Sequence, residues 1–454
     1  MTRNCVLPLL LAFGISGLAA AQDAERSQIV TPQGTVIIPQ SSIEEPGDAG
    51  LRMHTNTKIF VPAGRDAATM NPDNTFAEYP ESLACVYKVG PAYTGCTPSN
   101  NGKIATGGWG AIALVDAYDD SHAASDLAFY SSFMGLPAAK FTKVLANTSF
   151  GTLNGRTASC AGTPPPAYVA GKNGRDWDIE ESLDIEIAHA MAPAAAIILV
   201  EACSNSDSDL YFAEEVAGKE VAAAGGGDIS NSWGGGEYAN EVNDDNVFFR
   251  YYWSHISYFA SAGDSGWGAA YPSSSPWVVS AGGTTINRNA SQDFVSESCW
   301  SGSGGGVSQY ELWKSPPVFG EGMGPWVAYQ YSFAGTGARQ TPDMSFDADP
   351  ASGVFVYDTD EGGTWYVVGG TSVASPALAG IANASNDRAG QALPTGGKYT
   401  NRENNLIYSE YDMHLTYADY FYDVTTGSNG TGHNAAANYD QCTGIGSPRG
   451  HVGK

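Results

Sequence analysis

The most informative stretch of this chain reads Gly369-Gly370-Thr371-Ser372-Val373-Ala374-Ser375-Pro376. The four residues before it, 365–368, are aromatic or β-branched, which is typical of a buried strand. Apolar residues then recur at helical spacing as far as Ala382, and Pro376 is tolerated in a first helical turn. Unpaired N–H groups at a helix start stabilise negative charge. The pattern therefore favours a nucleophilic Ser372 over a serine that only caps the helix.

A serine nucleophile normally needs a histidine as its base. None of the seven histidines stands in a His-Gly-Thr-His setting, so a subtilisin-type triad has no obvious base. Some other group must then take the proton of Ser372. One alternative keeps an imidazole and builds the triad from Asp116 with His122 or His189. A neutral to alkaline activity optimum would favour that alternative.

The composition is strongly acidic, with 48 acidic against 22 basic residues and a net charge of −26. Such a balance argues against binding to nucleic acid or to anionic membranes, so neither is expected as a partner. It suits solubility in a mildly acidic medium, where part of the repulsion is titrated away. The 55 glycines and an aromatic content of 11 % indicate a packed, turn-rich globule rather than a disordered chain.

Residues 1–21 have the pattern of a signal peptide. Arg3 precedes an apolar run over 6–18, and small residues at 19–21 offer a cleavage site. The run is too short to span a membrane comfortably, so we expect a soluble, monomeric protein that is secreted, or periplasmic in a Gram-negative host. Residues 22–80 show little periodicity and are expected to form a short pro-segment or N-terminal arm, followed by the main domain over 81–454.

The mature chain keeps six cysteines, and an even number in an exported protein favours disulfides over metal ligation. Cys85–Cys96 is the preferred pair because it closes a short loop. The other four, Cys160, Cys203, Cys299 and Cys442, allow three arrangements, and a Cys160–Cys203 bridge is a guess among them.

From about residue 100 the chain alternates apolar strands with amphipathic helices. The expected strands cover 112–115, 196–200, 229–233, 258–260, 278–281, 354–357 and 365–368, with helices near 127–134, 210–224 and 247–256. Alternation of this kind predicts an α/β fold, with a mainly parallel sheet covered by helices on both faces.

A further helix is predicted from Trp177 to the residues before Pro193. Glu180 and Asp184 lie one turn apart on its surface, on the same face. Two carboxylates so placed repel each other when both are ionised, so one pKa rises and the pair shares a proton. Such a pair can take a proton from Ser372 in mildly acidic solution. The alternative is an ordinary solvated helix face.

The hexapeptide Ser261-Ala262-Gly263-Asp264-Ser265-Gly266 follows an expected strand, at the sheet edge where open parallel sheets bind ligands. A protonated Asp264 could donate a hydrogen bond to the oxyanion of a tetrahedral intermediate. An ionised Asp264 would repel that oxyanion, so activity should fall as pH rises. The alternative is a turn aspartate that satisfies its own backbone.

Taken together, these motifs resemble the sedolisins, the serine-carboxyl peptidases. The Glu-x-x-x-Asp helix, the Gly-Asp-Ser-Gly loop and the Gly-Thr-Ser-x-x-x-Pro serine occur in the family's order, and 271–276, 282–284, 304–308 and 341–345 also match. The resemblance implies a subtilisin-like fold for residues 81–454. It also implies these roles: Glu180 as general base and acid, Asp184 as its orienting partner, Asp264 as oxyanion stabiliser and Ser372 as nucleophile.

The same resemblance implies a serine-type endopeptidase that cuts proteins or peptides at acidic pH through an acyl-enzyme, with tripeptidyl peptidase activity also open. Ser232-Trp233-Gly234 resembles the segment beside the substrate backbone, which would place Trp233 and Gly234 at the specificity pocket. The alternative from another class is an inactive, calcium-stabilised extracellular binding protein on a protease scaffold.

The C-terminal stretch 423–444 resembles the family's single structural Ca²⁺ site. The matching ligands are the side chains of Asp423 and Asp440 and the backbone carbonyls of Val424, Ala436 and Asn438. Two departures stand out. The family usually has glycine at the last two carbonyl positions, and it typically has a long prodomain where this chain has about sixty residues. Self-cleavage at an unidentified bond before about residue 80 is expected.

Overall fold

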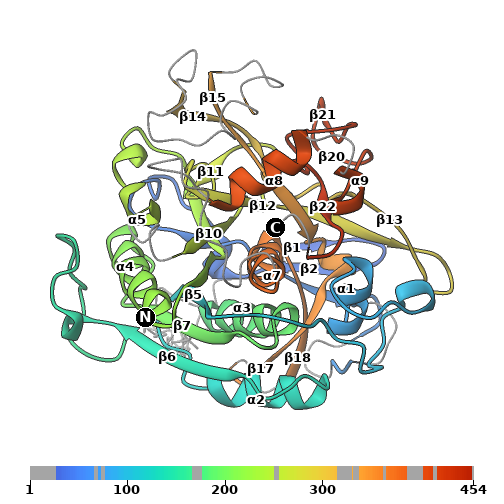
Figure 1. Cartoon of the computed structure of the whole chain (residues 1–454), viewed down its shortest axis with the longest axis horizontal. Coiled ribbons are helices and arrows are strands. Elements are labelled where there is room, and N and C mark those ends of the chain that lie inside the picture. The colour runs from blue at the N-terminus through green and yellow to red at the C-terminus, as the bar shows by residue number, and fades with distance from the viewer. Residues whose placement is uncertain are drawn as a thin grey trace, which may run out of the picture.

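The computed structural model describes residues 27–65, 70–72, 77–165, 176–249, 255–313, 330, 337–360, 364–385, 402–412 and 417–451. An eight-stranded sheet lies at its centre, in the order β13-β12-β10-β8-β5-β7-β6 with β16 beside β12 (Figure 1). Its strands are β5 (Ala111–Ala117), β6 (Lys140–Ala146), β7 (Ala196–Ala202), β8 (Gly227–Asn231), β10 (Ile256–Ser261), β12 (Val278–Arg288), β13 (Phe294–Cys299) and β16 (Met344–Asp347). All its neighbouring strands pair in parallel except β12 and β13.

Helices cover both faces of this sheet, as predicted. One face carries α2 (Ala123–Phe133), α3 (Trp177–Met191) and α7 (Thr371–Asn383), and the other carries α4 (Asp207–Ala223) and α5 (Asn246–Phe249) (Figure 1). Two separate apolar clusters fill the space between these helices and the sheet. The helix expected over 247–256 is wrong at its end, because Ile256 already begins β10.

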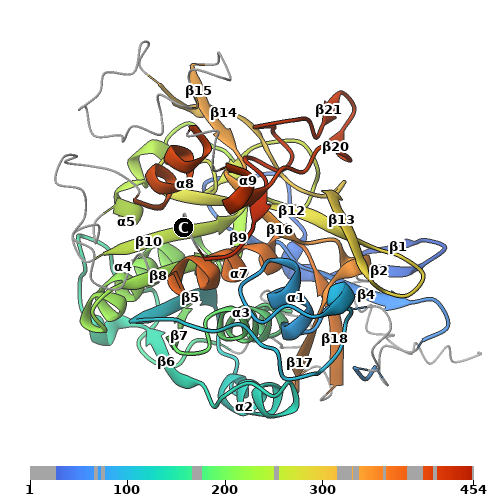
Figure 2. The same ribbon diagram turned by 45° about the vertical axis from the view of Figure 1, so that its right-hand side comes forward.

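A second, five-stranded sheet corrects part of the predicted topology. Its order is β1 (Ser27–Val30), β2 (Gly34–Ile38), β4 (Lys58–Pro62), β18 (Thr364–Gly369) and β17 (Val354–Asp358), and all its pairs are antiparallel. The strands expected at 354–357 and 365–368 thus exist but lie outside the parallel sheet. The connection between them is too short for the crossover that parallel neighbours need, so they form a hairpin. Figure 2 shows the blue strands of the N-terminal segment running beside β18.

A small third sheet joins β3 (His54–Thr55), β9 (Trp233–Gly236) and β11 (Ala270–Tyr271). The remaining helices and strands are α1 (Pro80–Val86), β14 (Gly306–Leu312), β15 (Ala338–Thr341), α8 (Arg402–Asp412), α9 (Tyr417–Tyr420), β19 (Phe421–Tyr422), β20 (Ser428–Gly430), β21 (His433–Asn434) and β22 (Ser447–Pro448). Within the described ranges no helix is both long and apolar enough to cross a bilayer.

Three disulfides link the six cysteines of the described residues. Cys85–Cys96 and Cys160–Cys203 confirm the two predicted pairs, and Cys299–Cys442 completes the set. The predicted signal peptide over residues 1–21 lies outside the described residues.

Candidate active site

Ser372 is the second residue of α7 and is fully buried. The chain enters α7 from β18 through Gly370, whose φ of +107° is one that residues with side chains rarely adopt. This turn places the Ser372 Oγ 3.0 Å from the carbonyl oxygen of Ser232, directly after β8. The predicted strand-turn-helix around Ser372 is therefore confirmed.

The Glu180 and Asp184 side chains lie inside the protein. All 15 residues of α3 are buried, since one side packs on the central sheet and another on α7. The alternative of a solvated helix face is therefore wrong. Glu180 Oε1 has no hydrogen-bond partner among the described residues. The Ser372 hydroxyl is near enough to Glu180 to influence the pKa of this carboxyl.

The pKa values of both carboxyls are shifted upward. Burial raises the pKa of Glu180 well above its ordinary value, the charge of Asp116 raises it further, and the hydroxyls of Ser372 and Thr57 partly offset the rise. The pKa of Asp184 is raised by burial, then by the charges of Asp116 and Glu180. Because buried like charges repel, these carboxyls share protons instead of ionising together.

Ser232 connects Asp184 to the turn that carries the serine. Its Oγ lies 2.6 Å from Asp184 Oδ1 and 3.1 Å from the carbonyl oxygen of Ser372. A hydroxyl has a single hydrogen to donate, so both contacts are full hydrogen bonds only when Asp184 is protonated and donates to Ser232. The geometry thus suits a protonated Asp184 beside an ionised Glu180, which accepts a hydrogen bond from the Thr57 hydroxyl.

Asp116, at the carboxyl end of β5, is a third buried carboxyl of this group. Neither of its oxygens has a hydrogen-bond partner within the described part of the chain. Burial raises its pKa from 3.8 to about 8. The sequence analysis considered Asp116 only as a member of a histidine-based triad. The structure instead places it against the carboxylates of α3.

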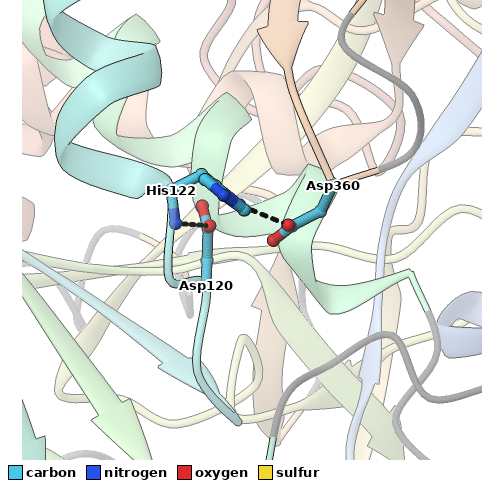
Figure 3. Close-up of side chains that lie close together, drawn as sticks. All are labelled: Asp120, His122 and Asp360. Atoms are coloured by element: carbon cyan, nitrogen blue, oxygen red, sulfur yellow. Dashed lines mark hydrogen bonds and ion pairs between the residues drawn. The ribbon is translucent and has the colours of Figure 1, made fainter.

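The two histidines of that alternative triad lie elsewhere. His122 pairs with Asp360, and its ring is about half exposed (Figure 3). His189 Nε2 lies 2.8 Å from the carbonyl oxygen of Pro137. Neither has a contact with Ser372, so the histidine-based alternative lacks its base. Ligand atoms of Asp120, His122 and Asp360 lie within 4.8 Å of one another, but the His122–Asp360 hydrogen bond accounts for that arrangement without a metal.

Asp264 follows β10 and faces the turn before Ser372. Its Oδ1 accepts hydrogen bonds from the backbone N–H (2.7 Å) and the hydroxyl (2.9 Å) of Thr371. Burial raises its pKa, and Lys58, whose Nζ lies 3.5 Å from Oδ2, partly offsets the rise. A Cβ atom on Gly370 would lie 2.5 Å from Oδ2, so this oxygen points at the chain entering α7.

Sequence reasoning missed one part of the site, the segment 56–58 of the N-terminal arm. In order, its three residues contact Ser372, Glu180 and Asp264. The residue types in this segment carry no periodicity or motif that signals such contacts. Only the folding of the arm across the carboxyl ends of β8 and β10 brings them there.

A cleft of about 540 Å³ borders this site, lined by Gly234 to Gly236, the loop 262–270 and residues 54–56 of the arm. Gly234 thus lies where the specificity pocket was expected. The indole of Trp233 does not, because it is fully buried and its Nε1 donates to the carbonyl of Val115 at 2.7 Å. Trp233 is therefore not among the residues that line the cleft, and its place at a specificity pocket stays a prediction.

Two pairs of the predicted calcium ligands are in contact near the C-terminus. The backbone N–H of Ala436 donates to Asp440 Oδ2 at 2.9 Å, and that of Asn438 donates to both oxygens of Asp423 at 3.2 Å. Asn438 has φ of +71°, a conformation that asparagine tolerates. No lysine or arginine of the described ranges forms an ion pair with either aspartate. The carboxylates of Asp423 and Asp440 and the carbonyls of Val424, Ala436 and Asn438 are oxygen donors of the type that Ca²⁺ prefers, and a calcium site at these residues stays a prediction.

Comparison with known proteins agrees with the geometry. A family model, the Subtilase family (Peptidase_S8), matches residues 160–395, just over half of the chain. The chain belongs to the subtilase family. One relative, kumamolisin from Bacillus sp. (strain MN-32), is 28% identical over 370 residues, which cover 75% of this chain and 58% of kumamolisin. The chain thus spans less than two thirds of that relative.

Sedolisin from Pseudomonas sp. (strain 101) is 30% identical to this subtilase over 201 residues, covering 40% of this chain and 29% of sedolisin. A solved structure of Pseudomonas sedolisin, a serine-carboxyl proteinase in complex with pseudo-iodotyrostatin, superposes with a TM-score of 0.58 at 22% identity, over 83% of this chain and 96% of the other. The predicted fold class and the resemblance to the sedolisins are confirmed.

Proposed function

We propose that this subtilase hydrolyses peptide bonds as a serine-carboxyl peptidase. The observation that carries the proposal is the buried Glu180/Asp184 pair beside Ser372, at a serine that no histidine of the described residues contacts. Both carboxyls are held in an environment that raises their pKa, which suits proton exchange with a hydroxyl in mildly acidic solution.

In the proposed reaction, Ser372 Oγ attacks the substrate carbonyl while Glu180 takes its proton. Asp184, protonated and bonded to Ser232, keeps negative charge from building up on both carboxyls. The Ser372 N–H and a protonated Asp264 donate to the oxyanion. Glu180 then protonates the leaving amine, and a water molecule repeats the sequence to release the acyl group from Ser372.

Acidic operation follows from Asp264, because only its protonated form donates to an oxyanion. Protein or peptide substrates are proposed, and the kumamolisin and sedolisin relatives support a peptidase without deciding between endopeptidase and tripeptidyl peptidase activity. Export is proposed from the leader pattern of residues 1–21 and the three disulfides, and the monomeric state stays a prediction. A structural Ca²⁺ is proposed at Asp423 and Asp440.

The test is hydrolysis of a denatured protein or peptide library by the purified chain between about pH 3 and 8. Ser372→Ala and Glu180→Ala should each abolish hydrolysis, and Asp264→Ala should lower kcat about 10²–10³-fold, while circular dichroism shows the parent fold. Glu181→Gln is the matched control, since Glu181 is equally buried on the same helix but does not contact Ser372. Near-full activity of Glu180→Ala would refute the assignment of Glu180 as the base. If the parent protein and all variants are folded but none of them hydrolyses any substrate, the result would favour the inactive binding protein.

A further inference from the structure

Residues 54–56 of the N-terminal arm lie along the cleft in the extended form of a bound peptide. β3 pairs antiparallel with β9, with His54 opposite Gly234. The Asn56 N–H continues this pairing and donates to the Ser232 carbonyl at 3.1 Å. Peptides commonly bind by adding such a strand to an exposed sheet edge. Residues 54–56 therefore occupy the edge of β9 that a peptide substrate needs.

The carbonyl group of Asn56 lies at the nucleophile. The Ser372 N–H donates to the Asn56 carbonyl oxygen at 3.1 Å, and the Ser372 Oγ lies 3.1 Å from the Asn56 nitrogen. A Cβ atom on Gly370 would lie 2.0 Å from that carbonyl oxygen and 2.5 Å from Asp264 Oδ2, so the two oxygens are neighbours. The Asn56 carbonyl oxygen thus accepts from one proposed oxyanion donor, the Ser372 N–H, and lies near the other, Asp264.

The far side of this peptide bond faces the proposed general acid. The Thr57 hydroxyl donates to Glu180 Oε2, and the Lys58 ammonium donates to the carbonyl of Asp264 at 2.7 Å. From Lys58 the chain continues as β4, which is held between β2 and β18. The stretch after the bond is therefore anchored independently of the stretch before it.

The Asn56 side chain fills a polar pocket beside the cleft. Its Nδ2 donates to Ser261 Oγ at 2.7 Å, and a Cβ on Gly234 would lie 3.7 Å from Nδ2. Gly234 thus lies beside this side chain, and Ser261 offers it a specific hydrogen bond. A pocket built this way favours a residue with a terminal amide before the cut bond.

We propose that the Asn56–Thr57 bond is the protein's own processing site, cut intramolecularly by Ser372. The inference rests on the proposed function. Ser372 Oγ bonds to the Asn56 carbonyl carbon as Glu180 takes its proton; the bond to Thr57 nitrogen then breaks, and Glu180 protonates the departing amine. Water hydrolyses the resulting ester, leaving an Asn56 carboxylate and a free Ser372 hydroxyl. Until then residues 54–56 occupy the strand edge and the position at Ser372 that a substrate needs, so the uncut chain is latent.

The test follows the full-length chain by intact mass and N-terminal sequencing after a shift from neutral to acidic pH. We expect a new N-terminus at Thr57, a released fragment ending at Asn56, and a first-order rate that does not depend on protein concentration. Ser372→Ala should stay uncut. Asn56→Leu, which loses the bond to Ser261, should slow the cut at least tenfold, while Asn101→Leu at an exposed loop position should not.

Specificity supplies a second measurement. The processed protein should cut a synthetic peptide with the sequence of residues 53–60 after its asparagine, and a leucine at that position should lower the rate. A cut at another bond, or equal processing of Ser372→Ala, would overturn the inference. A chain that hydrolyses the peptide library yet stays whole at Asn56–Thr57 would overturn it and leave the proposed function standing. Absence of both reactions would count against both proposals.

Discussion

Replacement of Asp116 by asparagine is expected to reduce the loss of unfolding free energy that the protein suffers when the pH rises from 4 to 7. Asp116 is fully buried against Glu180 and Asp184, with no hydrogen-bond partner for either oxygen among the described residues. Ionising it therefore places an uncompensated charge in the interior. Asparagine keeps the size of the side chain and removes that charge.

The size of the effect follows from the pKa of Asp116, which burial raises from 3.8 to about 8. Between these two values the folded state binds the proton more tightly than the unfolded state. The stabilisation is therefore complete below the unfolded pKa and is lost as pH rises toward the folded pKa. At pH 7 the loss spans about three pKa units, or roughly 4 kcal/mol at about 1.36 kcal/mol per unit.

The measurement is urea unfolding, followed by tryptophan fluorescence at pH 4 and pH 7, in a Ser372→Ala background that prevents self-digestion. Asp116→Asn should lose about 4 kcal/mol less of its unfolding free energy between these pH values than the background protein does. Asp412→Asn, at an exposed position at the end of α8, is the control and should behave like the background. Equal losses in Asp116→Asn and the background protein would refute the reasoning.

Three further outcomes are expected. Asp264→Asn carries an amide that donates a hydrogen bond at any pH, so it should keep hydrolysing peptides at neutral pH, where the parent protein loses activity. Asp264→Ala should lose about 10²–10³-fold in kcat at all pH values. A pH profile of Asp264→Asn like that of the parent would contradict this expectation. Gly370→Ala should block processing at Asn56–Thr57, as read by intact mass, because its Cβ would lie 2.0 Å from the Asn56 carbonyl oxygen. Chelation by EDTA should lower the Tm of the parent, whereas Asp440→Asn should start lower and not respond; an unchanged parent Tm would argue against bound Ca²⁺.

Much of the site could be predicted from local patterns. The approach of a strand through two glycines into α7 depends on residues within a few positions of Ser372, and so does the one-turn spacing of Glu180 and Asp184 on α3. Strand and helix periodicity likewise determined the parallel sheet. The spacing of side chains along a helix or a strand is set by backbone geometry alone. These patterns could therefore be recognised without knowing what the helices and strands pack against.

What only the tertiary structure decided depends on contacts between distant parts of the chain. The burial of every carboxyl on α3, and with it the raised pKa values, arises from packing between the sheet and α7. The antiparallel sheet that takes up β17 and β18 needs strands from the N-terminal arm. Asn56 reaches Ser372 across 316 residues of sequence, and no local pattern records such an encounter. The catalytic residues could be predicted from the sequence because their pattern depends on residue type and spacing. The position of residues 54–56 at Ser372 could not be predicted, because it depends on the path of the folded chain.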